Sequence, residues 1–234
     1  MSTRVAVVGG HGKTGRAVAT ALGARGVDVV VTGRAEWENL TAALVGCAAV
    51  YLIAPNLDVD EPGYVAHVLE AARKAEVGRV VYHSVASPHL PALPHHLDKA
   101  ESEDLVRRSG LPWTILQPGP YLQNLDLTTT VRLPYDAHAT FGFADLADVG
   151  AAAAVVLLES GHAGATYELA SRVATVAELA AEAGVDVVVE RPTGRPGSRE
   201  EALLRAMFDY YDQHGLPVGT LPLRALLALG RPEE

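Results

Sequence analysis

The segment from Gly9 to Gly15 combines glycines with a lysine and a threonine, the residue types of an anion-binding loop. It directly follows the apolar run Arg4 to Val8, and its spacing fits G-x-x-G-x-x-G and G-x-G-x-x-G equally well. Such glycines permit a tight turn, close approach of the backbone to a ligand, and close packing of the following helix. A pyrophosphate there would meet free N–H groups and the positive end of the helix dipole. We therefore predict a dinucleotide site, the alternative being a glycine turn that binds nothing; the expected ligands are Gly9, His11, Gly12, Lys13, Thr14 and Gly15.

The end of the second apolar run bears on the choice of cofactor. Val27 to Thr32 has the pattern of a buried strand, and Gly33 and Arg34 follow it. An acidic residue at this point would hold a ribose 2′-hydroxyl, whereas an arginine would accept a 2′-phosphate. Arg34 therefore favours NADPH over NADH. Glu36 lies close enough to oppose this preference for NADPH. The alternative for Arg34 is that it is a solvated surface charge.

The ends of the later apolar runs carry further candidate cofactor ligands. In open α/β sheets, ligands bind at the carboxyl ends of the parallel strands. We therefore expect the residues that end these runs to line the cofactor: Ala54, Pro55, Asn56, Ser84 and Pro118.

Three side chains could take part in proton transfer beside a bound cofactor. Lys99 lies on the helix predicted after Ser84, where a lysine could orient the ribose and lower the pKa of a neighbouring donor. His95 is a candidate donor because histidine titrates near neutral pH, and Tyr121 is another. The alternatives are surface positions for His95 and Lys99, and a place in the pocket wall for Tyr121.

The stretch around His95 is dense in histidine, which raises the question of a metal. Prolines interrupt it, no helical i, i+4 pair of ligands is evident, and no cysteine joins it. We therefore predict no metal site among His83, His89, His95, His96 and Asp98.

Strand and helix patterns alternate five times in the first half of the chain. Parallel strands need crossover connections, which are usually helices, so the alternation predicts a Rossmann-type, doubly wound parallel sheet of the α/β class. We expect strands at 4–8, 27–32, 48–54, 79–83 and 113–117, and helices at 14–24, 37–44, 63–75 and 97–109.

The regularity weakens after about residue 120. Asp145 or Asp148 can cap a helix that runs to Glu159, and strands are expected at 166–170 and 185–190. Capping boxes at Thr175 and Ser198 open two further helices. We predict a dinucleotide-binding core over 1–120 and a small α+β lobe on the substrate side over 121–234, with some chain returning to the core. The last helix carries an apolar stripe that suits core packing, a subunit contact or a substrate lid: Leu203, Leu204, Met207, Phe208 and Tyr211.

Composition narrows the class of protein. The chain has 234 residues, 49% of them hydrophobic, and a net charge of −9 without a basic run, which argues against nucleic acid and anionic membranes as partners. The single cysteine, Cys47, cannot form an intramolecular disulfide. No run is long and apolar enough to span a membrane. We expect a cytoplasmic monomer or homodimer that binds a small-molecule substrate.

Several segments in this order resemble the NmrA-like proteins, an atypical branch of the short-chain dehydrogenase/reductase superfamily. The resemblance implies a Rossmann domain that binds NADPH or NADH, a small C-terminal lobe, and a cleft between them. It also implies that Ser84 and Lys99 flank the nicotinamide. The segments that carry it are residues 7–16, 50–55, 79–84, Lys99 with Glu103, 109–119 followed by Tyr121 and Asn124, and 145–149.

The chain departs from the family pattern at two places. About twenty residues are missing after Arg34, where relatives place a loop, a helix and a strand that ends in an acidic residue near the adenine. The superfamily's Tyr-x-x-x-Lys is also absent, because His95 stands four residues before Lys99.

The leading hypothesis is an NADPH-dependent oxidoreductase that transfers hydride to a small, partly apolar carbonyl, quinone or enone. The missing tyrosine favours a second hypothesis, an NAD(P)-sensing regulator or binding protein without turnover. A third is a non-redox isomerase or cyclase, because fold alone does not decide function.

Overall fold

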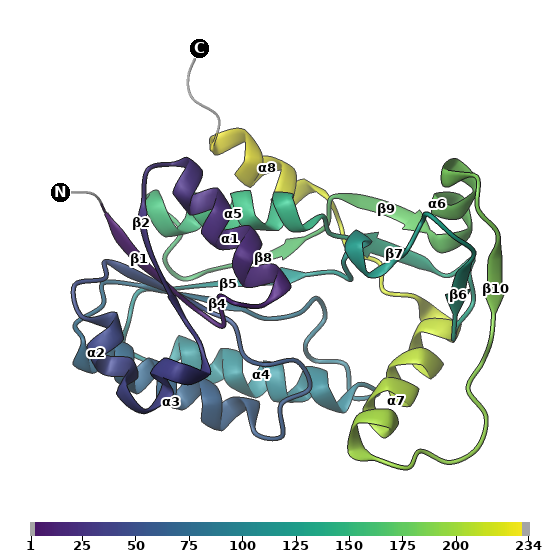
Figure 1. The fold of residues 1–234 in the computed structure, drawn as a ribbon, viewed down its shortest axis with the longest axis horizontal. Coiled ribbons are helices and arrows are strands. Elements are labelled where there is room, and N and C mark those ends of the chain that lie inside the picture. Colours follow the sequence, from purple (N-terminus) through teal and green to yellow (C-terminus); the bar gives the residue numbers. More distant parts are fainter. Residues whose placement is uncertain (1–2, 231–234) are drawn as a thin grey trace.

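A six-stranded parallel sheet forms the centre of the computed structural model, which describes residues 3–230 (Figure 1). Its strand order is β2-β1-β3-β4-β5-β8. The predicted doubly wound Rossmann-type sheet is therefore confirmed. The strands are β1 (Arg4–Val8), β2 (Asp28–Thr32), β3 (Ala49–Leu52), β4 (Val80–His83), β5 (Trp113–Pro118) and β8 (Ala165–Leu169).

Helices cover both faces of this sheet (Figure 1). One face carries α1 (Lys13–Ala24), α5 (Leu146–Leu158) and α8 (Leu221–Leu229); the other carries α2 (Leu40–Leu44), α3 (Glu61–Lys74) and α4 (Pro94–Arg107). Val5 and Val7 pack in the first layer, whereas Ala6 and Val8 pack in the second. Because successive side chains of a strand point to opposite faces, a strand covered on both sides has to be apolar throughout.

A smaller lobe with its own apolar core lies beside the carboxyl ends of the strands (Figure 1). Phe141, Phe143 and Leu216 are among its fully buried side chains. β8 and α8 belong to the sheet layers although they follow residue 120 in the chain. The lobe contains β6 (Val131–Leu133) paired with β10 (Val187–Val189), β7 (Thr140–Phe143) paired with β9 (Arg172–Thr175), α6 (Val176–Ala183) and α7 (Arg199–His214).

Two helix boundaries differ from the prediction in ways that matter for the site. The helix expected at 37–44 is a 3-10 helix η1 (Arg34–Asn39) followed by α2, so the turn begins at Arg34 itself. Helix α4 starts at Pro94, because proline is tolerated in the first helical turn. His95 therefore lies on a helix and not in the loop that its neighbouring prolines suggested.

Asp145 caps α5 by accepting a hydrogen bond from the Ala147 N–H, whereas Asp148 lies in the first turn of that helix. None of the described helices combines the length and apolarity needed to cross a membrane.

Candidate active site

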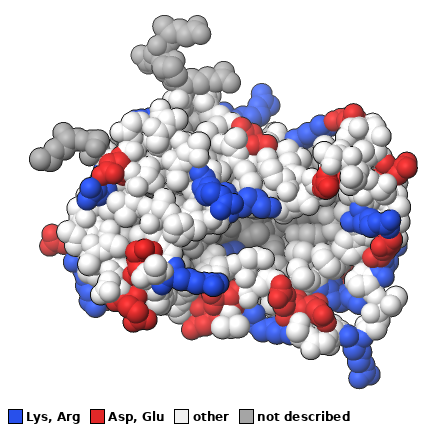
Figure 2. Space-filling view, viewed as in Figure 1, with Lys and Arg blue, Asp and Glu red and all other residues white. Residues whose placement is uncertain are grey.

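A cleft of about 1740 Å³ opens between the carboxyl ends of the strands and the small lobe. Figure 2 shows it as a hollow with Lys and Arg side chains at its rim. Every residue predicted to bind cofactor or move a proton lines this cleft. The tertiary structure thus brings together side chains that lie between positions 9 and 121 of the chain.

The glycine loop joins β1 to α1, and its glycines serve different purposes. A Cβ on Gly15 would collide with Gly10 and with the Gly9 carbonyl, and Gly9 has a φ of +79°, so the turn itself requires these glycines. Gly12 differs, because a Cβ there would meet just one neighbouring atom, the Gly9 oxygen, at 3.4 Å. Within residues 3–230, no neighbouring atom demands a glycine at position 12. The open space suits a ligand that approaches the backbone, as a cofactor diphosphate would.

The charge around this loop also suits an anion. Lys13 and Arg16 lie in the first turns of α1, which carries no acidic residue in its first turn. Arg16 donates a hydrogen bond to the His11 carbonyl at 2.5 Å, and Lys13 donates to Asn124 Oδ1 at 3.2 Å. Two cations at the positive end of a helix dipole attract phosphate groups.

The end of the cleft next to β2 is built by η1. The Glu36 carboxylate accepts a hydrogen bond from the Gly33 N–H at 2.8 Å, so it caps this turn, while Arg34 is exposed and lines the cleft. Trp37 stacks on Tyr64 with ring centroids 4.4 Å apart, and both line the cleft. The shortened segment after β2 therefore still provides an aromatic wall and an arginine.

Lys99 projects into the cleft from α4 and is held by a residue that the sequence did not single out. Its Nζ lies 2.6 Å from Oε1 of Glu61, and the Tyr82 hydroxyl donates to the same oxygen at 2.6 Å. The Glu61 side chain is 4% exposed. The helix was predicted to start at Gly63, which left Glu61 outside it. Asp60 was the sequence signal for the earlier start, because it caps α3 by accepting a hydrogen bond from the Gly63 N–H.

Ser84 lines the cleft, but its hydroxyl turns into the protein. It donates to Oε1 of Glu103 at 2.5 Å, and Gln117 donates to the same oxygen at 2.6 Å. Arg107 neutralises Glu103 from the adjacent turn of α4, at 2.8 Å. This buried cluster joins α4 to β4 and β5, and it leaves the Ser84 side chain in the wall of the cleft without a hydroxyl proton to offer.

His95 occupies the position of the superfamily tyrosine, and its environment differs from the expectation. Burial, with the nearby Lys99 charge, lowers the pKa of His95 to about 4. Its Nδ1 is buried and has no hydrogen-bond partner among the described residues. The ring is therefore neutral near pH 7, whereas the proposed acid role rests on a pKa near neutrality.

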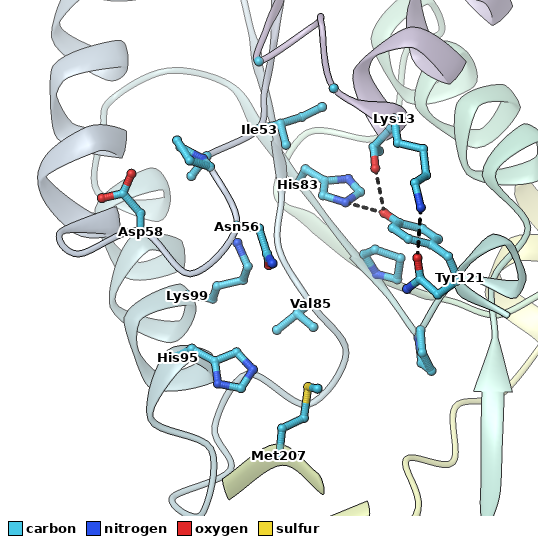
Figure 3. A pocket seen from close by; sticks show the side chains of 18 of the residues that line it. Lys13, Ile53, Asn56, Asp58, His83, Val85, His95, Lys99, Tyr121 and Met207 are labelled. Atoms are coloured by element: carbon cyan, nitrogen blue, oxygen red, sulfur yellow. Dashed lines mark hydrogen bonds between the residues drawn. The ribbon is translucent and has the colours of Figure 1, made fainter. Parts of the chain in front are cut away.

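Tyr121 stands across the cleft from Lys99 and His95 (Figure 3). Its hydroxyl lies 2.7 Å from His83 Nε2 and accepts from Thr14 Oγ1 at 3.3 Å. His83 Nδ1 in turn lies 2.6 Å from the Tyr51 hydroxyl. Burial lowers the pKa of His83 to about 3 and raises that of Tyr121 to about 12, so both groups are neutral near pH 7.

The far end of the cleft is apolar. Met207, Phe208 and Tyr211 project into it from α7, so three residues of the predicted stripe form a wall of the cleft. Tyr211 also packs against Phe141 in the core of the lobe, with ring centroids 5.1 Å apart. The stripe therefore serves both core packing and the cleft. No group of three or more His, Cys, Asp or Glu side chains in the described part of the chain is arranged to hold a metal ion.

The chain shares sequence with known proteins. Residues 24–160 match the model of a family described as NAD(P)H-binding. Quinone oxidoreductase 2 of Escherichia coli (strain K12) is 31% identical over 173 residues, which are 71% of this chain and 60% of that relative. The chain thus spans about three-fifths of that relative's length.

Many solved structures share the fold. The Citrobacter sp. triphenylmethane reductase complexed with NADP(H) aligns with a TM-score of 0.77 at 21% identity, covering 97% of this chain and 95% of that one. NmrA, a negative transcriptional regulator, aligns with a TM-score of 0.79 at 19% identity, covering 97% and 92%. The expected resemblance to NmrA-like proteins is confirmed.

Proposed function

The chain belongs to the NAD(P)H-binding family, and on that premise we propose that it is an NADPH-dependent oxidoreductase acting on a small, partly apolar carbonyl, quinone or enone. One observation carries the proposal. A single cleft connects the glycine loop, through Lys99, to the apolar wall formed by Met207, Phe208 and Tyr211. A cofactor site alone would not need that apolar extension, whereas a reductase needs a place for its substrate beside the cofactor. The relationship to a quinone oxidoreductase supports the same class of reaction.

Several groups of this chain fit NADPH in particular. Arg34 is exposed at the cleft, where it can meet a 2′-phosphate, and Glu36, the acidic group that could hold a 2′-hydroxyl, already accepts a hydrogen bond from the Gly33 N–H. Lys13 and the open space at Gly12 suit the diphosphate. Trp37 and Tyr64 offer the adenine an aromatic surface.

When bound, the reduced nicotinamide supplies the hydride. Lys99 has further N–H groups beside the one that faces Glu61, and these can donate to a substrate oxygen as negative charge develops there. Glu61 holds the ammonium in place, and the Tyr82 hydroxyl in turn donates to the same Glu61 oxygen. His95 contributes an imidazole that is neutral near pH 7, so it can form a hydrogen bond but lacks the acidic second proton of an imidazolium.

The second candidate function is a cofactor sensor without turnover. It is favoured by the replacement of the superfamily tyrosine with a histidine whose pKa is about 4, and by the fold shared with a transcriptional regulator.

The deciding experiment is an NADPH titration followed by a consumption assay across quinones, enones and small carbonyl compounds. We expect saturable binding of NADPH and loss of its absorbance with at least one apolar acceptor. Binding without consumption by any acceptor would favour the sensor, and failure to bind NADPH would reject both functions.

A further inference from the structure

A chain of neutral polar groups runs from the protein core to the glycine loop. The Tyr51 hydroxyl lies 2.6 Å from His83 Nδ1, and His83 Nε2 lies 2.7 Å from the Tyr121 hydroxyl. Thr14, in the first turn of α1, donates to the same Tyr121 oxygen at 3.3 Å. The four side chains come from β3, β4, α1 and the segment after β5. Tyr51 is fully buried, whereas Tyr121 lines the cleft.

The direction of these hydrogen bonds follows from counting protons. Within residues 3–230 the Tyr51 hydroxyl has one hydrogen-bond partner, His83 Nδ1. A buried O–H that donates to nothing is costly, so Tyr51 donates and Nδ1 accepts. His83 is neutral and carries a single ring proton, which must then lie on Nε2. The Nε2–H therefore donates to Tyr121.

The Tyr121 oxygen thus receives two hydrogen bonds, from His83 and from Thr14. Its own proton is directed to neither of them and remains available to a group in the cleft. Thr14 marks where that group lies, because the first turn of α1 is the end of the helix that favours an anion. Lys13 and Asn124 join the same two segments at 3.2 Å, so the segment after β5 is held against the glycine loop (Figure 3).

We propose that Tyr121 donates its hydroxyl proton in a hydrogen bond to the diphosphate of the cofactor, and that Tyr51 and His83 are positioning residues that aim it. This inference rests on the proposed function insofar as that function requires a nicotinamide dinucleotide. It assigns Tyr121 to cofactor binding in place of the proton-donor role that the sequence suggested.

The first test measures binding and needs no turnover. The probes are NADPH and 2′-phospho-ADP-ribose, which keeps the diphosphate but lacks the nicotinamide, and both are titrated by calorimetry. Tyr121→Phe should lower the affinity for both probes by a similar factor, roughly 10–100-fold, as expected for the loss of a hydrogen bond to a charged group. The matched control is Tyr167→Phe, which removes a hydroxyl bonded to a histidine, His162, at 2.9 Å, outside the cleft. That control should leave both affinities unchanged.

The outcomes separate this inference from the proposed function. Unchanged affinities in Tyr121→Phe together with a reduced kcat would overturn the inference and restore Tyr121 as a proton donor to substrate. Tight binding in the native protein, lost in Tyr121→Phe, with no consumption of NADPH by any acceptor would support the inference and reject the reductase. Failure of the native protein to bind either probe would reject both.

The second test reads the hydrogen-bond direction from the ring nitrogens of His83. Nitrogen-15 chemical shifts distinguish the two neutral tautomers, and His83→Gln identifies the signals. We expect the neutral Nε2–H form between pH 5 and 8. Tyr51→Phe changes no residue of the cleft wall. It should lower the affinity for 2′-phospho-ADP-ribose by roughly 2–10-fold, the value of one neutral hydrogen bond. A predominant Nδ1–H form would mean that Tyr121 donates its proton to His83, and the inference would fail.

Discussion

The Lys99 ammonium and the Glu61 carboxylate form an ion pair of 2.6 Å at the wall of the cleft, 38 residues apart in the chain. The Lys99 side chain is 18% exposed, whereas that of Glu61 is 4% exposed. The charged end that reaches the cleft is therefore the lysine. Glu61 fixes the lysine from the start of a different helix, α3.

We expect Lys99→Met to lower kcat by at least about tenfold, because charge developing on the substrate oxygen would lose its hydrogen-bond donor. Glu61→Gln should lower kcat less, because the lysine remains but is no longer held. The double variant should be no slower than Lys99→Met, since both changes act on one group. Steady-state NADPH consumption measures all three. The exposed pair Glu70–Lys74 supplies a control, Glu70→Gln, which should be silent. If the loss of kcat in the double variant equalled the product of the two single losses, Glu61 would not act through Lys99.

Cofactor preference should depend on Arg34. NADPH should bind more tightly than NADH, and Arg34→Ala should remove most of the difference, roughly 10–100-fold for charged contacts to a phosphate. Glu36→Gln should preserve the preference, because an amide oxygen can still accept from the Gly33 N–H. Dissociation constants for both nucleotides, measured in the three proteins, test this. Equal affinities in the native protein would count against a 2′-phosphate site.

Two glycines of the loop should respond differently to substitution. Gly12→Val should fold normally but lose NADPH binding, because the side chain occupies space that the protein leaves open. Gly15→Ala should lower the melting temperature, because its Cβ collides with Gly10 and the Gly9 carbonyl. Thermal melts and calorimetry on both variants separate the effects. Tight NADPH binding to a folded Gly12→Val protein would show that the diphosphate lies elsewhere.

His95 should not behave as a general acid. Its pKa of about 4 keeps the ring neutral above pH 5, so kcat should show no inflection from this residue between pH 6 and 8. His95→Gln should retain activity within the roughly 2–10-fold that one neutral hydrogen bond is worth, well short of the 10²–10⁴-fold of acid catalysis. The pH profile of kcat in both proteins decides the point, and an inflection near pH 6.5 that vanished in the variant would restore the acid role.

Acid should destabilise the fold through its buried histidines. The pKa of His83 is lowered from 6.5 to about 3, so between these values the unfolded chain binds a proton that the folded protein does not. The free energy of unfolding therefore falls as the pH falls from 6.5 towards 3, by roughly 1.4 kcal/mol per pH unit for one fully neutral histidine. His83→Gln should flatten this slope, as measured by urea unfolding between pH 4 and 7. An unchanged slope would mean that His83 titrates normally.

The sequence by itself was sufficient for the glycine loop and the parallel sheet. Both depend on residues that are contiguous: the loop joins one strand to one helix, and each buried strand is apolar because both of its faces are covered. Arg34 could be placed for the same reason, directly after β2. The short strands β6, β7 and β9 escaped prediction because three or four residues carry little periodicity and their partners lie far along the chain.

Only the tertiary structure decided which polar groups meet and in which protonation state. Glu61 reaches Lys99 across 38 residues and Thr14 reaches Tyr121 across 107, distances in the chain over which no spacing rule operates. Burial lowers the pKa of His95 far below the value that suggested an acid, and burial depends on what packs around a side chain. Local patterns record the residues that a strand or helix needs, whereas proton positions and ion pairs follow from contacts made after these elements have packed together.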